Sequence, residues 1–160
     1  MTNNTLMAWH YSRGHNYAAI IKSGFLACAT AGISEGEKPV VWFSINQLWE
    51  ATVNGMTIEA DRITYTKLTM LETKATNGGL YRFGVPSGQL IPWINLIKVA
   101  NISSKTKKVL EASARKSGSN PFQWCGSLQR IDIRETIIET MNDANKWQSV
   151  EKDVHIKQDA

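Results

Sequence analysis

The sequence has few of the features that mark membrane-bound, secreted or disulfide-rich proteins. No apolar run in its 160 residues approaches the roughly 20 residues that a membrane-spanning helix needs. Only two cysteines are present, Cys28 and Cys125, and we expect two free thiols rather than a disulfide. The first residues, Met1 to Thr5, lack the basic and apolar regions of a signal peptide. We therefore expect a cytoplasmic protein with no membrane partner.

Recognisable motifs for common cofactor and catalytic sites are missing as well. The sequence has no G-x-G-x-x-G or Walker loop, no H-E-x-x-H or Cys/His metal set, and no G-x-S-x-G elbow. These absences argue against a Rossmann dinucleotide site, a P-loop, a zinc site and a hydrolase elbow. We expect no metal ion.

What is present suits a single globular domain with a substantial core. Apolar residues make up 42% of the chain and charged residues 20%, with a formal net charge of +4. Predicted strands and helices interleave without strict βαβ order, which indicates an α+β fold. We expect one domain over residues 1–148, followed by a polar, mobile tail over residues 149–160.

The apolar periodicity and the turn signals predict the individual elements. Ser12 is expected to cap the first helix, and Gly24 to end it. Residues 45–50 could form a helical turn. Residues 135–147 have helical spacing, although Thr136 to Ile138 could instead extend a strand. The remaining strands are predicted at residues 6–11, 40–43, 62–68, 80–85 and 128–133, and the remaining helices at 93–100 and about 103–117.

Two further features could carry function. The chain has six tryptophans, and those at strand ends either pack in the core or stack on a planar ligand. Between Lys98 and Lys116 the chain has six basic residues and one acid, Glu111. This stripe is either a solvated helix face or a surface that attracts the phosphates of a nucleic acid. The basic residues taken as candidate nucleic-acid contacts are Lys105, Lys107, Lys108 and Arg115.

The region from Trp9 to Ser44 carries a resemblance to a known family. Trp9-His10-Tyr11-Ser12 is followed by Asn16-Tyr17 and by Ile20-Ile21-Lys22-Ser23-Gly24-Phe25-Leu26, and later by Val41-Trp42-Phe43-Ser44. This arrangement resembles the opening of ADP-ribosyltransferases of the diphtheria-toxin and poly(ADP-ribose) polymerase class. Bacterial DNA ADP-ribosylating toxins and RNA 2'-phosphotransferases have related openings. The match covers about residues 6 to 50.

The resemblance implies a split, mixed or antiparallel β-sheet that binds NAD as a substrate, flanked by helices. His10 would contact the adenosine ribose, Ser12 the nicotinamide-side ribose or amide, and the backbone at Tyr11 the carboxamide. Trp42, Phe43 or Trp49 would stack on the nicotinamide ring. Tyr11 stands where the family usually has glycine, and a bulky residue there is compatible with the branch that modifies nucleic acids.

The resemblance also implies a carboxylate that stabilises the positive charge of the reacting ribose and activates the acceptor. Glu135 is the first candidate, because it follows the predicted late strand, and Glu139 and Glu50 are alternatives. His10 and Glu135 would thus form the catalytic pair. Arg82, on the strand over residues 80–85, is a candidate contact for a phosphate of the dinucleotide.

Three functions therefore remain open at this point. The chain could be an ADP-ribosyltransferase that modifies a nucleic acid or a protein, as in a toxin or in phage–host conflict. It could instead be a non-catalytic module that binds NAD, ADP-ribose or a nucleic-acid end. The third alternative is a protein-interaction domain without a small ligand.

Overall fold

The computed structural model describes residues 4–151 and has an antiparallel sheet flanked by four α-helices, which confirms the predicted α+β class. The helices are α1 (Gly14–Ser23), α2 (Met70–Thr76), α3 (Trp93–Val99) and α4 (Ser104–Lys116), with short 3-10 turns η1 (Ala51–Val53), η2 (Ser87–Gln89), η3 (Pro121–Gln123) and η4 (Ile133–Glu135). The strands are β1 (Met7–Arg13), β2 (Phe25–Leu26), β3 (Val41–Ser44), β4 (Met56–Ile58), β5 (Tyr65–Lys67), β6 (Leu80–Pro86), β7 (Ile91–Pro92), β8 (Trp124–Ser127), β9 (Ile131–Asp132), β10 (Ile137–Met141) and β11 (Trp147–Ser149).

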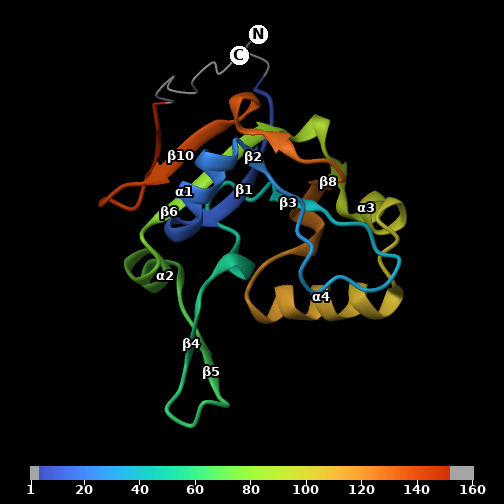
Figure 1. Ribbon diagram of the computed structural model, residues 1–160, viewed down its shortest axis with the longest axis horizontal. Coiled ribbons are helices and arrows are strands. Elements are labelled where there is room, and N and C mark those ends of the chain that lie inside the picture. Colours follow the sequence, from blue (N-terminus) through green and yellow to red (C-terminus); the bar gives the residue numbers. More distant parts are fainter. Residues whose placement is uncertain (1–3, 152–160) are drawn as a thin grey trace.

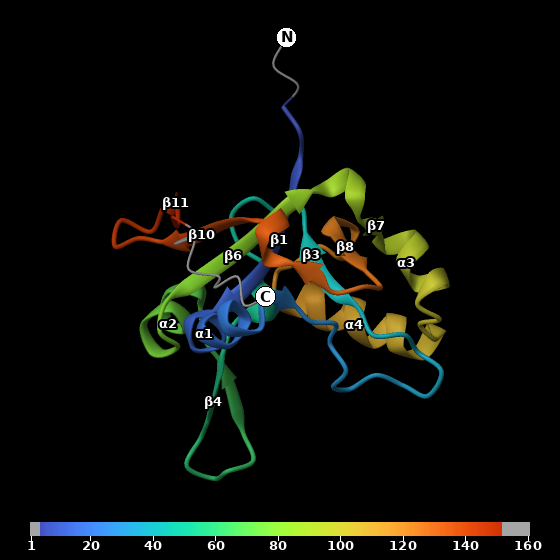
Figure 2. The same cartoon turned by 45° about the horizontal axis from the view of Figure 1, so that its top comes forward.

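Seven strands form the main sheet, in the order β11-β10-β6-β1-β3-β8-β7, and all neighbours are antiparallel. Figure 2 shows them in this order from left to right. Helices α1 and α2 lie on the side of β6, whereas α3 and α4 lie on the side of β8 (Figure 1). Two short pairs, β2 with β9 and β4 with β5, complete the strands of the described residues.

Strands β1 and β3 diverge almost at once, although they are neighbours in the sheet. Strand β1 pairs with β6 along its whole length, from Met7↔Pro86 to Arg13↔Leu80. With β3 it has one registered pair, Trp9↔Ser44. Continuing that register would bring Tyr11 opposite Trp42, but the ladder does not extend there. The main sheet is therefore open between these two strands.

Local sequence signals explain the ends of α1 and α4. Helix α1 ends at Gly24 in the left-handed conformation (φ 77°), as predicted. Helix α4 begins after Ser103, whose side chain accepts a hydrogen bond from the amide of Thr106. The predicted cap of α1 was wrong: Ser12 belongs to β1, and the N-cap is Arg13, which makes no capping bond through its side chain.

Two later parts of the chain also differ from the prediction. The strand expected over residues 128–133 is wrong for most of its length: β8 ends at Ser127, residues 128–130 form a bend, and only Ile131–Asp132 form a strand, β9, outside the main sheet. The helix expected over residues 135–147 is wrong, and the strand alternative is confirmed, because β10 pairs with β6 from Ile137↔Gly84 to Thr140↔Tyr81. Cross-strand burial of Ile138 and Met141 outweighs the helical spacing of the apolar residues.

Residues 45–50 do not form the expected helical turn, since the 3-10 turn η1 begins only at Ala51. Beyond it, β4 and β5 form a hairpin that projects from the body beside α4 (Figure 1). All residues from Met56 to Lys67 are exposed. The large apolar side chains among them are Met56, Ile58, Ile63 and Tyr65.

Cys28 and Cys125 are free thiols, as expected. Burial raises the pKa of Cys125 to about 12, so this thiol stays protonated and packs as a small apolar group. Strand β11 reaches Ser149, one residue beyond the predicted domain boundary, and residues 152–160 of the predicted tail lie outside the described residues. Within residues 4–151, no helix is long and apolar enough to cross a membrane.

Candidate functional site

A pocket of about 370 Å³ lies where β1 and β3 separate. Three consecutive residues of each strand line it: Trp9 to Tyr11 of β1, and Trp42 to Ser44 of β3. Consecutive residues of a strand point to opposite faces of a sheet. Both runs can therefore line one pocket only if it opens at the strand edges, where backbone groups are available to a ligand.

His10 occupies the gap between the two strands. Its Nδ1 lies 2.8 Å from the backbone oxygen of Trp42, and its ring packs edge-on against Phe43. Because a carbonyl oxygen only accepts, Nδ1 must carry the proton, and Nε2 of the neutral ring is then an acceptor. Burial lowers the pKa of His10, against the opposing effect of the hydrogen bond to Trp42, so the neutral form predominates at neutral pH.

Glu50 is the acidic residue that lines this pocket. It is buried, with 6% of its surface exposed, and its Oε1 accepts a hydrogen bond of 2.8 Å from the Thr52 hydroxyl. Within residues 4–151 it forms no ion pair. Lys67 acts on Glu50 electrostatically but forms no direct ion pair with it. A buried carboxylate without a direct ion-pair partner is costly. This cost is expected where a ligand or a developing positive charge supplies the partner.

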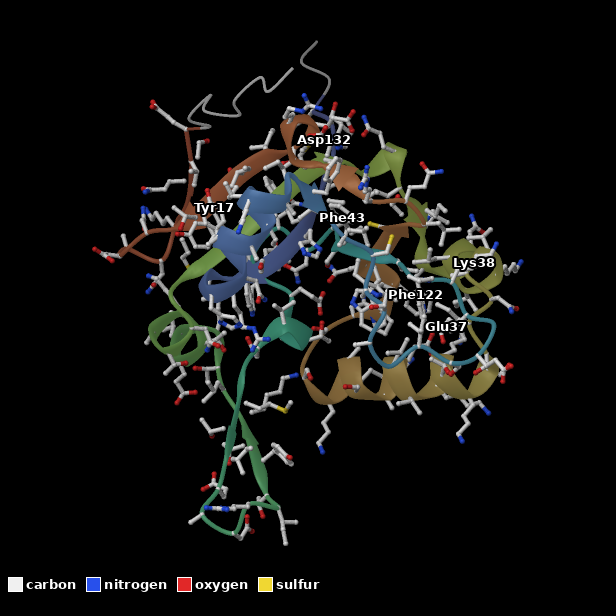
Figure 3. The ribbon with its side chains drawn as sticks, in the orientation of Figure 1. Tyr17, Glu37, Lys38, Phe43, Phe122 and Asp132 are labelled. Carbon is white, nitrogen blue, oxygen red and sulfur yellow. The ribbon has the colours of Figure 1, made fainter. Side chains whose placement is uncertain are left out.

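Aromatic residues form much of the remaining wall. Trp42 and Trp124 both line the pocket, and the Trp42 ring lies 5.9 Å from that of Trp93 and 6.2 Å from that of Trp124. Phe43 lies in the interior of the molecule (Figure 3). Tyr11 donates a hydrogen bond of 2.5 Å to the backbone oxygen of Asn46, and burial raises its pKa to about 12. The phenol of Tyr11 is therefore protonated and anchors the loop that follows β3.

Two predicted ligand contacts lie elsewhere in the structure. Trp49 is buried against Tyr11 and donates to Asn54 Oδ1 at 2.7 Å, but it does not line the pocket. Arg82 bonds to Glu139 and to the backbone oxygen of Gln47, with its guanidinium 3.8 Å from the centre of the Trp9 ring. These contacts give Trp49 and Arg82 structural roles.

Of the three candidate carboxylates, the structure brings only Glu50 to the pocket. Glu139 pairs with Arg82. Glu135 is exposed in η4 and lines neither this pocket nor its neighbour. Asp132, which caps η4, lies at the opposite end of the molecule from the β4–β5 hairpin (Figure 3). The choice of Glu135 rested on a late strand at residues 128–133, but that segment is a bend followed by the two-residue strand β9 and the start of η4.

The four basic candidates on α4 fall into two pairs. Lys105 and Lys108 are exposed. Lys107 and Arg115 instead lie 3.0 and 3.4 Å from the carboxylate of Glu111, which also accepts a hydrogen bond from the Trp93 indole. This bond to Trp93 is the main reason that the pKa of Glu111 is lowered. Helix α4 borders the pocket through Leu110 and Ser113, so the exposed lysines are on an element next to the site.

A second pocket of about 610 Å³ adjoins the first, and His10, Tyr11, Thr52 and Val53 line both. Ser12, a predicted contact, lines the second pocket. Arg13, Asn54 and Thr52 were not predicted. Thr52 and Asn54 join the site through the fold of a loop, which the sequence does not reveal, whereas Arg13 could have been found as the cation that ends the His10 strand.

Comparisons of the chain with models of protein families, with curated proteins and with solved structures find no match. Among residues 4–151, no group of three or more His, Cys, Asp or Glu side chains could hold a metal ion. The candidate site thus consists of His10, Glu50 and the aromatic walls of an open strand pair.

Proposed function

We propose that the two adjoining pockets bind NAD and that the protein is an ADP-ribosyltransferase with a split sheet of the kind that its opening sequence resembles. One observation carries this proposal: a neutral imidazole and an unpaired, buried carboxylate line a single pocket where β1 and β3 lose their pairing. Such a pocket offers strand-edge backbone groups to a carboxamide, and an aromatic wall to its ring.

His10 and Glu50 would have different tasks in this reaction. His10 Nε2, as an acceptor, would bind a ribose hydroxyl and fix the sugar. When the bond between C1' of the ribose and the nicotinamide nitrogen breaks, its electron pair leaves with nicotinamide, and positive charge develops on the ribose. The Glu50 carboxylate would stabilise that charge and then take the proton of the acceptor hydroxyl or amine as it bonds to C1'.

A nucleic acid is the proposed acceptor, because α4 borders the pocket and carries exposed Lys105 and Lys108. Lys107 and Arg115 would contribute less, since both are already paired with Glu111. Contacts of lysine with phosphates release counterions, so this binding should weaken steeply as the salt concentration rises.

The test is release of nicotinamide from NAD, and transfer of label from NAD to oligonucleotides or to protein. We expect Glu50→Gln to slow turnover by about 100-fold or more, as loss of a transition-state electrostatic contact does. Glutamine can still accept the hydrogen bond of Thr52, so the fold should persist. Glu135→Gln is the matched control, and it should keep full activity.

Other outcomes would redirect the assignment. Stabilisation by NAD without turnover in the wild type would indicate a non-catalytic NAD or ADP-ribose module. Equal turnover in Glu50→Gln and the wild type, with loss in Glu135→Gln, would return the catalytic role to Glu135. If NAD neither stabilises the protein nor is consumed, the proposal fails, and a protein-interaction domain becomes the better reading.

A further inference from the structure

The second pocket differs in charge from the first. Glu50 lines the first pocket, whereas no acidic residue is among those that line the second. The polar side chains of the second pocket include Ser12, Arg13, Asn16 and Asn54, all of which can donate hydrogen bonds. One pocket is thus lined by a carboxylate and the other by hydrogen-bond donors. Such a pair suits a ligand that carries positive charge at one part and negative charge at another.

Arg13 is the central feature of the second pocket. It is half-buried at the end of β1, and its guanidinium has no hydrogen-bond acceptor, carboxylate or aromatic partner in the described part of the chain. By contrast, Arg82 and Arg115 each contact a carboxylate. A guanidinium carries five donors in a planar fork that matches carboxylate and phosphate oxygens. Five unused donors beside a pocket therefore point to an anion.

The neighbouring Asn54 is oriented by a hydrogen bond on its other side. Its Oδ1 accepts the Trp49 indole N–H at 2.7 Å, which fixes the orientation of the amide. The Nδ2 group has no acceptor within residues 4–151, and Asn54 lines the second pocket. Arg13 is close to this position, since a Cβ atom on the adjacent Gly55 would lie 3.7 Å from Arg13 Nη1. The guanidinium of Arg13 and the amide of Asn54 thus both line the second pocket near the base of the hairpin.

We propose that the second pocket is a phosphate subsite, in which Arg13 binds phosphate oxygens through its planar fork and Asn54 donates from Nδ2. This inference rests on the proposed function and deepens it. It orients the dinucleotide, with the diphosphate at Arg13 and the nicotinamide ribose at Glu50. The cationic ring and the anionic linker of NAD then each meet a residue of opposite charge.

Calorimetric binding of three probes tests the subsite: ADP-ribose, inorganic pyrophosphate and nicotinamide. We expect Arg13→Gln to weaken ADP-ribose and pyrophosphate binding by about tenfold or more, since a hydrogen bond to a charged group contributes about 1.5–3 kcal/mol. Nicotinamide binding should not change. Arg62→Gln, at the exposed tip of the hairpin, removes the same charge and should leave all three affinities unaltered.

A second variant tests the subsite independently, in case Arg13→Gln does not fold. Asn54→Asp keeps an acceptor for the Trp49 indole but replaces the Nδ2 donors with a carboxylate oxygen. It should weaken ADP-ribose and pyrophosphate binding while preserving the melting temperature. If Arg13→Gln and Asn54→Asp both fold and bind the two phosphate probes as the wild type does, the subsite is wrong.

The outcomes separate this subsite from the proposed function. Unchanged KM for NAD in Arg13→Gln, with intact turnover, overturns the subsite and leaves the transferase standing. Loss of ADP-ribose binding in Arg13→Gln, together with a wild type that never consumes NAD, supports the subsite and overturns the enzyme. A wild type that binds neither ADP-ribose nor pyrophosphate overturns the subsite as well.

Discussion

At the scale of single residues, the protonation state of His10 matters most for the site. The hydrogen bond to Trp42 fixes the tautomer, and desolvation keeps the ring neutral. Protonation would replace the Nε2 acceptor with a donor, and it would bury a charge near Phe43 and Phe83. Stability and ligand binding should therefore depend on pH through the same atom.

We expect the free energy of unfolding to fall as the pH drops below about 6.5, the ordinary pKa of histidine. The pKa of His10 is lowered in the folded state, so at pH values below 6.5 the unfolded chain binds a proton more readily than the folded chain does. Lowering the pH therefore favours the unfolded state. The stabilisation is complete above pH 6.5 and is lost at lower pH. Urea denaturation at pH 7.5 and 5.5 measures it.

The variant His10→Asn provides the control, since its amide can still donate to the Trp42 oxygen but does not titrate. Its unfolding free energy should change less between the two pH values than that of the wild type. His15 is exposed and present in both proteins, so any contribution from it cancels from the comparison. Equal changes in the two proteins would show that His10 is not the titrating group.

Arg82 illustrates a residue whose partners are all structural. Its guanidinium lies between the rings of Trp9 and Trp147 and binds Glu139. We expect Arg82→Met to lower the free energy of unfolding by about 3–5 kcal/mol, because Glu139 would be left in a largely buried position without its cation. Chemical denaturation measures this loss. Unchanged stability with impaired NAD binding would instead restore Arg82 as a ligand contact.

At the scale of elements, the start of α1 depends on a close approach of two backbone segments. A Cβ atom on Gly14 would lie 1.8 Å from the backbone oxygen of Gly78. The amides of Gly14 and His15 donate to the backbone oxygens of Gly79 and Asn77, so the turn before β6 holds the helix start in place. This contact fixes α1 relative to β6.

We expect Gly14→Ala to destabilise the protein by about 1–3 kcal/mol, the range typical of overpacking, because backbone atoms must shift. Gly88→Ala is the control, since a Cβ atom there would meet nothing within 4 Å. The shift in the urea midpoint measures both changes. Similar midpoints for the two variants would contradict the close approach seen at Gly14.

The sequence predicted well the elements that depend on neighbouring residues. It failed for those whose position depends on pairing with distant parts of the chain. Helix α1, its end at Gly24 and strand β6 follow from nearby residues, and they were predicted. Strand β8 was missed because Trp124-Cys125-Gly126 alternates weakly and is held by β3 and β7. In the site, His10 and Phe43 follow from adjacent residues. Glu50 reaches the pocket only because the loop over residues 45–50 folds back.

At the scale of the whole molecule, the β4–β5 hairpin is separate from the core. Residues 56–67 are all exposed, and the base of the hairpin contacts α4 through a hydrogen bond of 2.5 Å from Lys67 Nζ to Ser117 Oγ. A lone two-stranded hairpin gains little stability of its own. The hairpin should therefore contribute little to the cooperative unfolding of the domain.

We expect replacement of residues 57–66 by a short Gly-Ser loop to change the melting temperature by only a few degrees. The core clusters contain no residue of this segment, so no buried apolar area is lost. Thermal denaturation followed by circular dichroism measures the effect. A large fall in melting temperature, or loss of cooperative unfolding, would show that the hairpin is part of the folding unit.

The single pair Trp9↔Ser44 divides the main sheet into two mechanical units, β11-β10-β6-β1 and β3-β8-β7. A ladder with one rung resists rotation far less than the seven-residue ladder between β1 and β6. The angle between the two half-sheets is thus only weakly held by backbone pairing, and a dinucleotide bound across the gap would bridge the two strands where their own pairing stops. The amide hydrogens of Tyr11 and Trp42, which face the gap between the two strands, would report that stiffening by slower exchange with solvent.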